Sequence, residues 1–189
     1  MKYLELRGKI SQNIFTFLDV VKMFADEPES AIKTQLSRFA KKRLLTKIKR
    51  GLYCFDPETI EELKLAGVLY QPSYVSLETA LNYYGIMPDI PSSVTSVATV
   101  TTKKIGTSFG VFSYTKIKVP LFFGFNKVKS PGSSGFFNLA GREKALLDYF
   151  YLRKIKATPG LRLSVKEFNL TVYQKYVRSF PAWVQAIKL

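Results

Sequence analysis

The chain has 189 residues, of which 47% are hydrophobic and 14% aromatic, so it can bury a core and is not a disordered polymer. Its formal net charge is +15 at pH 7, from 29 Lys and Arg residues against 14 Asp and Glu. A surplus of this size indicates a nucleic acid, an anionic surface or an acidic protein as partner.

The cysteine and histidine content excludes several kinds of site. Cys54 is the only cysteine and there is no histidine, so an internal disulfide, a Cys/His zinc site and a histidine-dependent nucleophile are all excluded. Cys54 falls in an apolar run and is expected to be a small core residue. No run of about 18 apolar residues is present, and residues 1–12 lack the apolar core of a signal peptide. We therefore expect a cytoplasmic protein with no membrane partner, no metal and no cofactor.

The start of the chain predicts two short helices. The first covers about residues 3–11. The second, residues 17–24, follows Thr16, which can cap its N-terminus while Asp19 reaches back as in a capping box. Pro28 disfavours helical geometry before it and ends this segment. The apolar positions of the second helix at helical spacing are Leu18, Val21 and Phe24.

A longer amphipathic helix is predicted from Glu29 to Arg43. Its apolar positions recur with a period of about 3.6 residues and predict one buried stripe. These positions are Ile32, Leu36, Phe39, Ala40 and Leu44. Residues 44–55 then alternate and turn at Gly51, which predicts a short β-hairpin. Helix, turn, helix and hairpin in this order predict a winged helix-turn-helix in residues 1–55.

The polar side of this third helix carries the candidate DNA contacts. The segment from Ser30 to Phe55 contains eight Lys or Arg residues and no acid. Arg38 and Gln35 have donors suited to base edges, whereas Lys41 suits phosphates. The full candidate set is Ser30, Lys33, Thr34, Gln35, Ser37, Arg38, Lys41, Lys42, Lys47, Lys49 and Arg50. The alternative is an ordinary amphipathic helix whose lysines only keep it in solution, and the basic hairpin tip argues against it.

Residues 56–189 predict a second domain of mixed α/β type. Asp56 and Pro57 predict the start of a helix that stops at Gly67, within a linker over residues 56–70. A helix capped by Ser76 is expected to end at Gly85. Segments rich in Val, Thr, Phe and Tyr then predict strands. These segments are residues 93–101, 110–119, 121–128 and 135–140.

The remainder of this domain is predicted to be helical. Residues 141–154 are apolar almost all round, which favours a helix buried against a sheet. The tail over residues 164–189 is predicted to be helical with an interruption at Pro181. The expected fold class is therefore α+β: a winged helix-turn-helix followed by an α/β domain whose antiparallel or mixed sheet is flanked by helices. Residues 101–189 carry 16 basic and 3 acidic groups, so positive charge is not confined to the first domain.

Acidic residues in the second domain offer little for catalysis. Asp89 with Glu143 and Lys144 could be read as part of a metal-dependent nuclease, but their spacing matches no known motif. Glu143 and Lys144 are more simply surface residues in the first turn of a helix. Asp148 lies in an apolar helix and is expected to pair with a basic group or accept a local hydrogen bond. No glycine-rich phosphate loop is present either. We expect a binding protein and not an enzyme.

Four blocks of sequence resemble the AbiEi family of type IV antitoxins, predicted transcriptional regulators of viral defence systems. The first is "LSRFAKKRLLTKIKRGLYCF" (36–55), and the second is "PSYVSLETALNYYGIMPDIP" (72–91). The third is "TSFGVFSYTKIKVPLFFGF" (107–125), and the fourth is "LAGREKALLDYFYL" (139–152). They occur in the same order as in the family and lie within residues 15–152.

The resemblance implies a protein with two roles. Its winged helix would bind inverted repeats in operator DNA and repress its own operon. Its second domain would counter a cognate nucleotidyltransferase toxin of the AbiEii type, through the toxin or its RNA substrate. The second-domain candidates that the matching blocks supply are Ser76, Glu78, Tyr83, Tyr84, Arg142 and Lys144. The alternative function is a stand-alone winged-helix regulator whose basic second domain binds RNA or an acidic protein.

Overall fold

The computed structural model describes residues 1–130, 135–164 and 167–188 of the chain. It is an α+β protein with two separate sheets, as the sequence predicts at this level. The chain divides into two compact units. The first is Met1–Ile60 with Gly106–Phe109, and the second is Glu61–Ile105 with Gly110–Leu189. Within the described ranges, no helix is long and apolar enough to cross a membrane.

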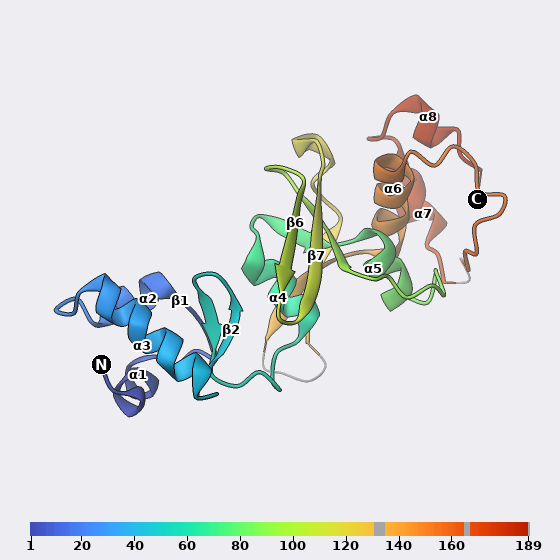
Figure 1. Ribbon diagram of the computed structural model, residues 1–189. Coiled ribbons are helices and arrows are strands. Elements are labelled where there is room, and N and C mark those ends of the chain that lie inside the picture. Colours follow the sequence, from blue (N-terminus) through green and yellow to red (C-terminus); the bar gives the residue numbers. More distant parts are fainter. Residues whose placement is uncertain (131–134, 165–166, 189) are drawn as a thin grey trace. The chain divides into compact units, whose positions relative to one another are not determined.

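The first unit combines three helices with a small sheet (Figure 1). Its helices are α1 (Tyr3–Lys9), α2 (Phe17–Met23) and α3 (Glu29–Lys41). Its strands are β1 (Ile14–Thr16), β2 (Thr46–Lys49) and β3 (Leu52–Cys54). They are antiparallel in the order β1-β3-β2. The hairpin β2–β3 was predicted from the sequence, whereas β1 was not.

The predicted capping box of α2 is confirmed, but the apolar residues named there at helical spacing do not all face the core. The Thr16 hydroxyl oxygen accepts a hydrogen bond from the Asp19 N–H at 3.1 Å, and Asp19 Oδ2 accepts one from the Thr16 N–H at 2.7 Å. Val20 and Phe24 are buried, while Leu18 is 63% exposed. Because α2 has only seven residues, one inward turn is enough to attach it to the core.

The core of the first unit is made by all three helices and the sheet together. Tyr3 packs edge-on against Phe39 with ring centroids 5.7 Å apart, which joins α1 to α3. Phe15 of β1 packs on Phe55 with centroids 4.6 Å apart. The buried cluster consists of Leu6, Ile10, Phe15, Val20, Phe24, Ile32, Leu36, Phe39, Leu45 and Phe55.

The predicted linker helix begins later than expected. Asp56 Oδ1 accepts a hydrogen bond from the Glu58 N–H at 3.1 Å, which closes a local turn. Asn13 also holds this segment, because its side chain accepts from the Asp56 N–H and donates to the Asp56 carbonyl, both at 2.8 Å. These bonds fix Asp56 to the first unit, so α4 covers only Glu62–Leu69. It runs through Gly67, contrary to expectation.

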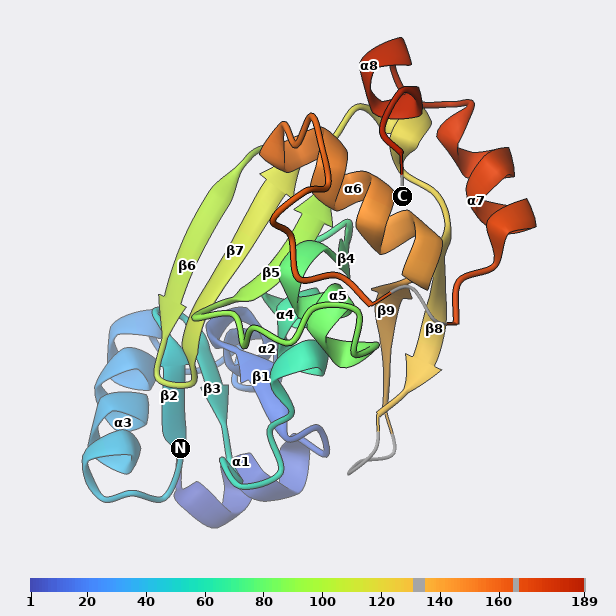
Figure 2. The ribbon, with the colours of Figure 1, turned by 90° about the vertical axis from the view of Figure 1, so that its right-hand side faces the viewer.

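The second unit is built on a six-stranded mixed sheet in the order β6-β7-β5-β4-β9-β8 (Figure 2). Its strands are β4 (Ser73–Val75), β5 (Val94–Ala98), β6 (Lys103–Thr107), β7 (Gly110–Lys116), β8 (Phe125–Lys129) and β9 (Phe136–Ala140). Strand β4 pairs antiparallel with β5 and parallel with β9, and β5 pairs parallel with β7. The sequence predicted β5, β7, β8 and β9 but neither β4 nor β6.

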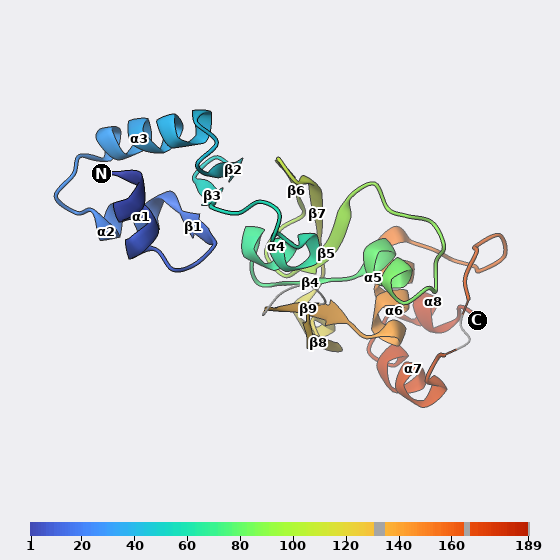
Figure 3. The same ribbon diagram turned by 90° about the horizontal axis from the view of Figure 1, so that it is seen from below.

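Helices cover both faces of this sheet. Figures 1 and 3 show α4 on one side and the helices α5 and α6 on the other. Helices α7 and α8 pack against α6 (Figure 2). The bounds are α5 (Leu77–Tyr83), α6 (Arg142–Arg153), α7 (Leu170–Val177) and α8 (Ala182–Gln185), with a short 3-10 turn η1 (Val119–Leu121). Helix α6 is buried along most of its length, as its sequence predicted, and α8 begins directly after Pro181.

Candidate functional site

The polar face of α3 is exposed as the sequence predicted. Lys33 and Arg38 lie on the exposed side, while Ile32 and Leu36 have no exposed surface. Leu44, expected in the same buried stripe, is 36% exposed, because α3 ends at Lys41 and not at Arg43 as predicted. Gln35 is half-buried at the edge of the polar face. The exposed members of the predicted set on this helix and just after it are Ser30, Lys33, Thr34, Ser37, Arg38, Lys41 and Lys42. The buried side fixes the rotation of the helix, so this polar side must face solvent or a partner.

Two of these side chains already have partners. Lys33 forms an ion pair with Glu29 at 3.6 Å, and its ammonium lies 5.0 Å from the centre of the Phe17 ring. The Thr34 hydroxyl donates to the Ser30 carbonyl at 2.9 Å. Among the described residues, Arg38 and Lys41 have no ion-pair partner. Lys42, at the end of the helix, has none among them either, so these three side chains are the most available donors on the face.

A Schellman motif ends α3 and directs the chain into the hairpin. Arg43 has a φ of 57° and stands where glycine is usual. The Arg43 N–H donates to the Ala40 carbonyl and the Leu44 N–H to the Phe39 carbonyl, both at 3.0 Å. The following strand therefore starts close to the C-terminal end of α3.

The hairpin keeps its predicted basic side chains near the turn. Lys47 and Arg50 are exposed and Lys49 is half-buried, while Ile48 between them is buried. Gly51 has a φ of 77°, the left-handed conformation that the turn requires. The hairpin therefore combines one inward apolar side chain with outward basic ones.

Two of the second-domain candidates lie inside a buried polar cluster. Ser76 and Lys144 have no exposed surface, and neither has Asp148. The Ser76 hydroxyl and the Tyr74 hydroxyl each donate to Asp148 Oδ2 at 2.9 Å. The Lys144 ammonium forms an ion pair with Asp148 and donates to the Tyr74 hydroxyl oxygen at 2.9 Å. These four residues are called the Lys144 cluster below.

The Lys144 cluster satisfies its own polar groups. Burial raises the pKa of Asp148 and lowers that of Lys144. The attraction between the two opposite charges favours both charged forms and therefore opposes both shifts. The ammonium also lies 5.2 Å from the Phe123 ring centre and 5.3 Å from that of Phe180. A Cβ on Gly124 would stand 3.0 Å from the Lys144 side chain. The cluster therefore fixes α6, β4 and the start of α5 in one arrangement.

The expectation that Glu143 and Lys144 lie on the surface is wrong. Glu143 is 9% exposed, and its Oε1 accepts a hydrogen bond from the Asn169 N–H at 2.8 Å. Its carboxylate thus holds the segment that leads into α7. Asp148 pairs with Lys144, as the sequence predicted. The described residues contain no group of three or more His, Cys, Asp or Glu placed to hold a metal ion.

The other candidates lie around the ends of α5 and α6. Arg153 donates to both carboxylate oxygens of Glu78, at 2.6 and 2.9 Å. Burial raises the pKa of Glu78, but the hydrogen bonds and charge of Arg153, together with hydrogen bonds from the Glu78 backbone and from Thr95, leave the pKa below its usual value. The Tyr84 hydroxyl donates to the Ala140 carbonyl at 3.0 Å, and the Arg142 guanidinium lies 5.0 Å from the Tyr84 ring centre.

The structure therefore separates the six candidates into groups. Ser76 and Lys144 share the buried cluster. Glu78 on α5 pairs with Arg153 on α6, and Arg142 lies over the Tyr84 ring. Tyr83 is 43% exposed and packs edge-on against Tyr84. Ser76 precedes α5 but does not cap it, because its hydroxyl bonds to Asp148. Sequence reasoning missed Tyr74, although a lysine and an aspartate four residues apart in an apolar helix already indicated a buried polar group needing partners.

No protein-family model matches this chain, and no curated protein does either. The family resemblance therefore rests on the four sequence blocks given above. The function argued below is drawn from those blocks and from the geometry of the two units.

Proposed function

We propose that the first unit is a winged helix-turn-helix that binds DNA, with α3 as the recognition helix and the β2–β3 hairpin as the wing. The observation that carries the proposal is the outward polar face of α3, fixed by its buried stripe and followed by a basic hairpin. An α-helix of this kind fits the major groove, where side chains reach base edges.

The candidate DNA contacts on α3 differ in how available their donor groups are to DNA. Arg38 can donate to a base edge, and Lys41 and Lys42 can contact phosphates. Lys33 is held by Glu29 and Phe17, so it contributes less than its place on the helix suggests. Arg50, exposed at the hairpin tip, would contact the phosphate backbone beside the groove. Phosphate contacts position the protein, whereas Arg38 gives sequence preference.

We further propose that the chain represses its own operon and acts as an antitoxin against a nucleotidyltransferase toxin. This part rests on the resemblance of four sequence blocks to type IV antitoxins. Two of those blocks contribute the Lys144 cluster, since β4 and the start of α5 come from one and α6 from the other. Four of the matching residues thus help to hold the second unit together.

The DNA-binding proposal is tested by titrating the full chain onto DNA from upstream of its own reading frame. Arg38→Ala/Lys41→Ala should bind more weakly, and the slope of log K against log salt should fall by about 0.9 for each lost phosphate contact. Lys2→Ala, at an exposed position beside α1, is the control for charge alone. Unchanged DNA binding by the double variant at several salt concentrations would refute α3 as the recognition helix.

The antitoxin proposal needs a separate experiment. The proposal expects a nucleotidyltransferase gene next to that of this chain, so the full chain is co-expressed with the product of such a gene and growth is followed. The Arg38→Ala/Lys41→Ala variant should still restore growth, because these residues lie in the first unit. Loss of rescue at equal protein levels would show that the two roles are not divided between the units as proposed.

A further inference from the structure

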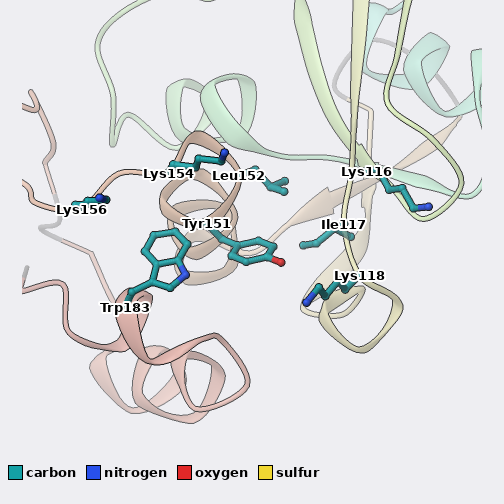
Figure 4. A pocket seen from close by; sticks show the side chains of 8 residues that line it. All are labelled: Lys116, Ile117, Lys118, Tyr151, Leu152, Lys154, Lys156 and Trp183. Carbon is teal, nitrogen blue, oxygen red and sulfur yellow. The ribbon is translucent and has the colours of Figure 1, made fainter.

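The second unit contains a lysine-rich cavity that is not part of the proposed DNA-binding surface on α3 and the β2–β3 hairpin. Its volume is about 720 Å³. The residues that give it its chemistry are Lys116, Lys118, Lys154, Lys156, Tyr151 and Trp183. Figure 4 shows the two aromatic rings in the middle, with two lysines from the end of β7 on one side and two from the segment after α6 on the other.

The aromatic rings form a platform with a fixed orientation. The Tyr151 and Trp183 rings are stacked, with centroids 6.1 Å apart and an interplanar angle of 24°. Phe180 packs edge-on against Tyr151 at 5.7 Å and holds it in place. Trp183 nevertheless remains 40% exposed, so part of its ring is accessible to a ligand. A flat aromatic ligand can therefore stack here without rearrangement of the core.

The cations around this platform are not neutralised within the cavity. All four lysines are exposed, and the described lining residues include no acid. None of the four has an ion-pair partner among the residues that the structure describes. Lys154 also adopts a φ of 56°, a conformation in which glycine is less strained. The cavity thus offers positive charge on two sides of an aromatic surface.

We propose that this cavity binds a nucleotide unit, with its base stacked on Trp183 and its phosphate held by the lysines. A ligand that is only a phosphate would make no use of the aromatic rings. An acidic peptide has no flat base to stack on them. Base stacking on aromatic rings beside basic side chains is the usual way to bind single-stranded nucleic acid. The same chemistry fits a free nucleotide, so the experiment must separate the two sources. The inference does not depend on the proposal that α3 binds DNA.

Trp183 gives a direct test, because it is the only tryptophan in the chain. The full chain is titrated with ATP, with an oligouridylate and with inorganic pyrophosphate, and tryptophan fluorescence is corrected for ligand absorbance. Saturable quenching by ATP or by the oligouridylate supports the proposal, and pyrophosphate should compete without quenching. Quenching by ATP alone identifies a free nucleotide as ligand, and tighter binding of the oligouridylate identifies a strand. Absence of quenching by both overturns the proposal.

Variants then locate the binding. Lys118→Ala/Lys154→Ala removes one lysine from each side and should weaken binding by about tenfold or more. On the oligouridylate each lost phosphate contact should also lower the salt slope by about 0.7. Lys175→Ala, an exposed lysine on α7, should bind as the unchanged protein does. Circular dichroism checks the fold, and equal weakening by Lys175→Ala would overturn the assignment to this cavity. Binding of ATP or of the oligouridylate by Arg38→Ala/Lys41→Ala should be unaffected. This variant therefore separates the test of the cavity from the test of DNA binding by α3.

Discussion

Lys144 and Asp148 lie one turn apart on α6 and form an ion pair in which neither side chain has exposed surface. The pair is enclosed by hydrogen bonds from Tyr74 and Ser76 and by the rings of Phe123 and Phe180. Two charges removed from water in this way are tolerated only when both keep their partners. The stability of the second unit should therefore depend on the two residues jointly.

A double-mutant cycle tests this dependence. Lys144→Met leaves a buried carboxylate without its counter-charge, and Asp148→Asn leaves a buried ammonium without one. Each should lower the free energy of unfolding by about 3–5 kcal/mol. In the double variant the amide oxygen introduced at position 148 can still accept from Ser76 and Tyr74, and no charge is buried. The double variant should therefore be more stable than Lys144→Met.

Urea unfolding followed by circular dichroism measures the three variants. Lys175→Ala is the surface control and should change stability by no more than about 0.5 kcal/mol. Additive effects of the two single changes would mean that the residues do not act as a pair.

Arg43→Gly should stabilise the first unit. Arg43 holds a left-handed conformation that costs an ordinary residue about 1–2 kcal/mol, partly offset by the greater entropy that glycine loses on folding, about 0.5–1 kcal/mol. We expect a net gain of about 0.5–1 kcal/mol in the free energy of unfolding. Lys42→Gly, one residue earlier at a φ of −81°, should instead be destabilising. The two variants are compared by thermal unfolding, and the reverse order would rule out strain at Arg43.

The capping box of α2 should make the first unit sensitive to acid. The Thr16 N–H and then its hydroxyl lower the pKa of Asp19 below its ordinary value of 3.8. A depressed carboxyl pKa stabilises the fold above the unfolded value, and this contribution disappears as pH falls through the folded value. Asp19→Asn should therefore weaken the dependence of stability on pH below about pH 4. Asp26→Asn, at an exposed position nearby, serves as comparison. Parallel pH profiles for Asp19→Asn and the unchanged protein would contradict the role of the box.

The thiol of Cys54 should be unreactive in the native protein. It has no exposed surface, and burial raises its pKa to about 11. The thiolate is the nucleophile, so iodoacetamide at about pH 8 should modify little of the native chain. Mass spectrometry should show full modification once urea is added. Rapid native labelling would mean that β3 opens readily.

Features set by neighbouring residues were predictable. The Thr16 and Asp19 cap, the stripe through Ile32 and Leu36, and the turn at Gly51 all depend on residues a few positions apart. Their spacing alone defines helix, face and turn. The candidate DNA contacts on α3 belong to this group, because their exposure follows from the phase of the buried stripe.

Other features depended on residues distant in sequence. Strand β4 has three residues, all buried, so it shows no alternation and is defined by pairing with β5 and β9. Asp56 has the sequence of a helix start, yet Asn13 holds it in a turn. Lys144 was expected on the surface, yet partners from β4 and from its own helix make its burial possible. Sequence by itself determined the cap of α2, the turn of the β2–β3 hairpin and the polar face of α3. Only the tertiary structure decided which polar groups are enclosed, because that requires partners brought together from separate parts of the chain.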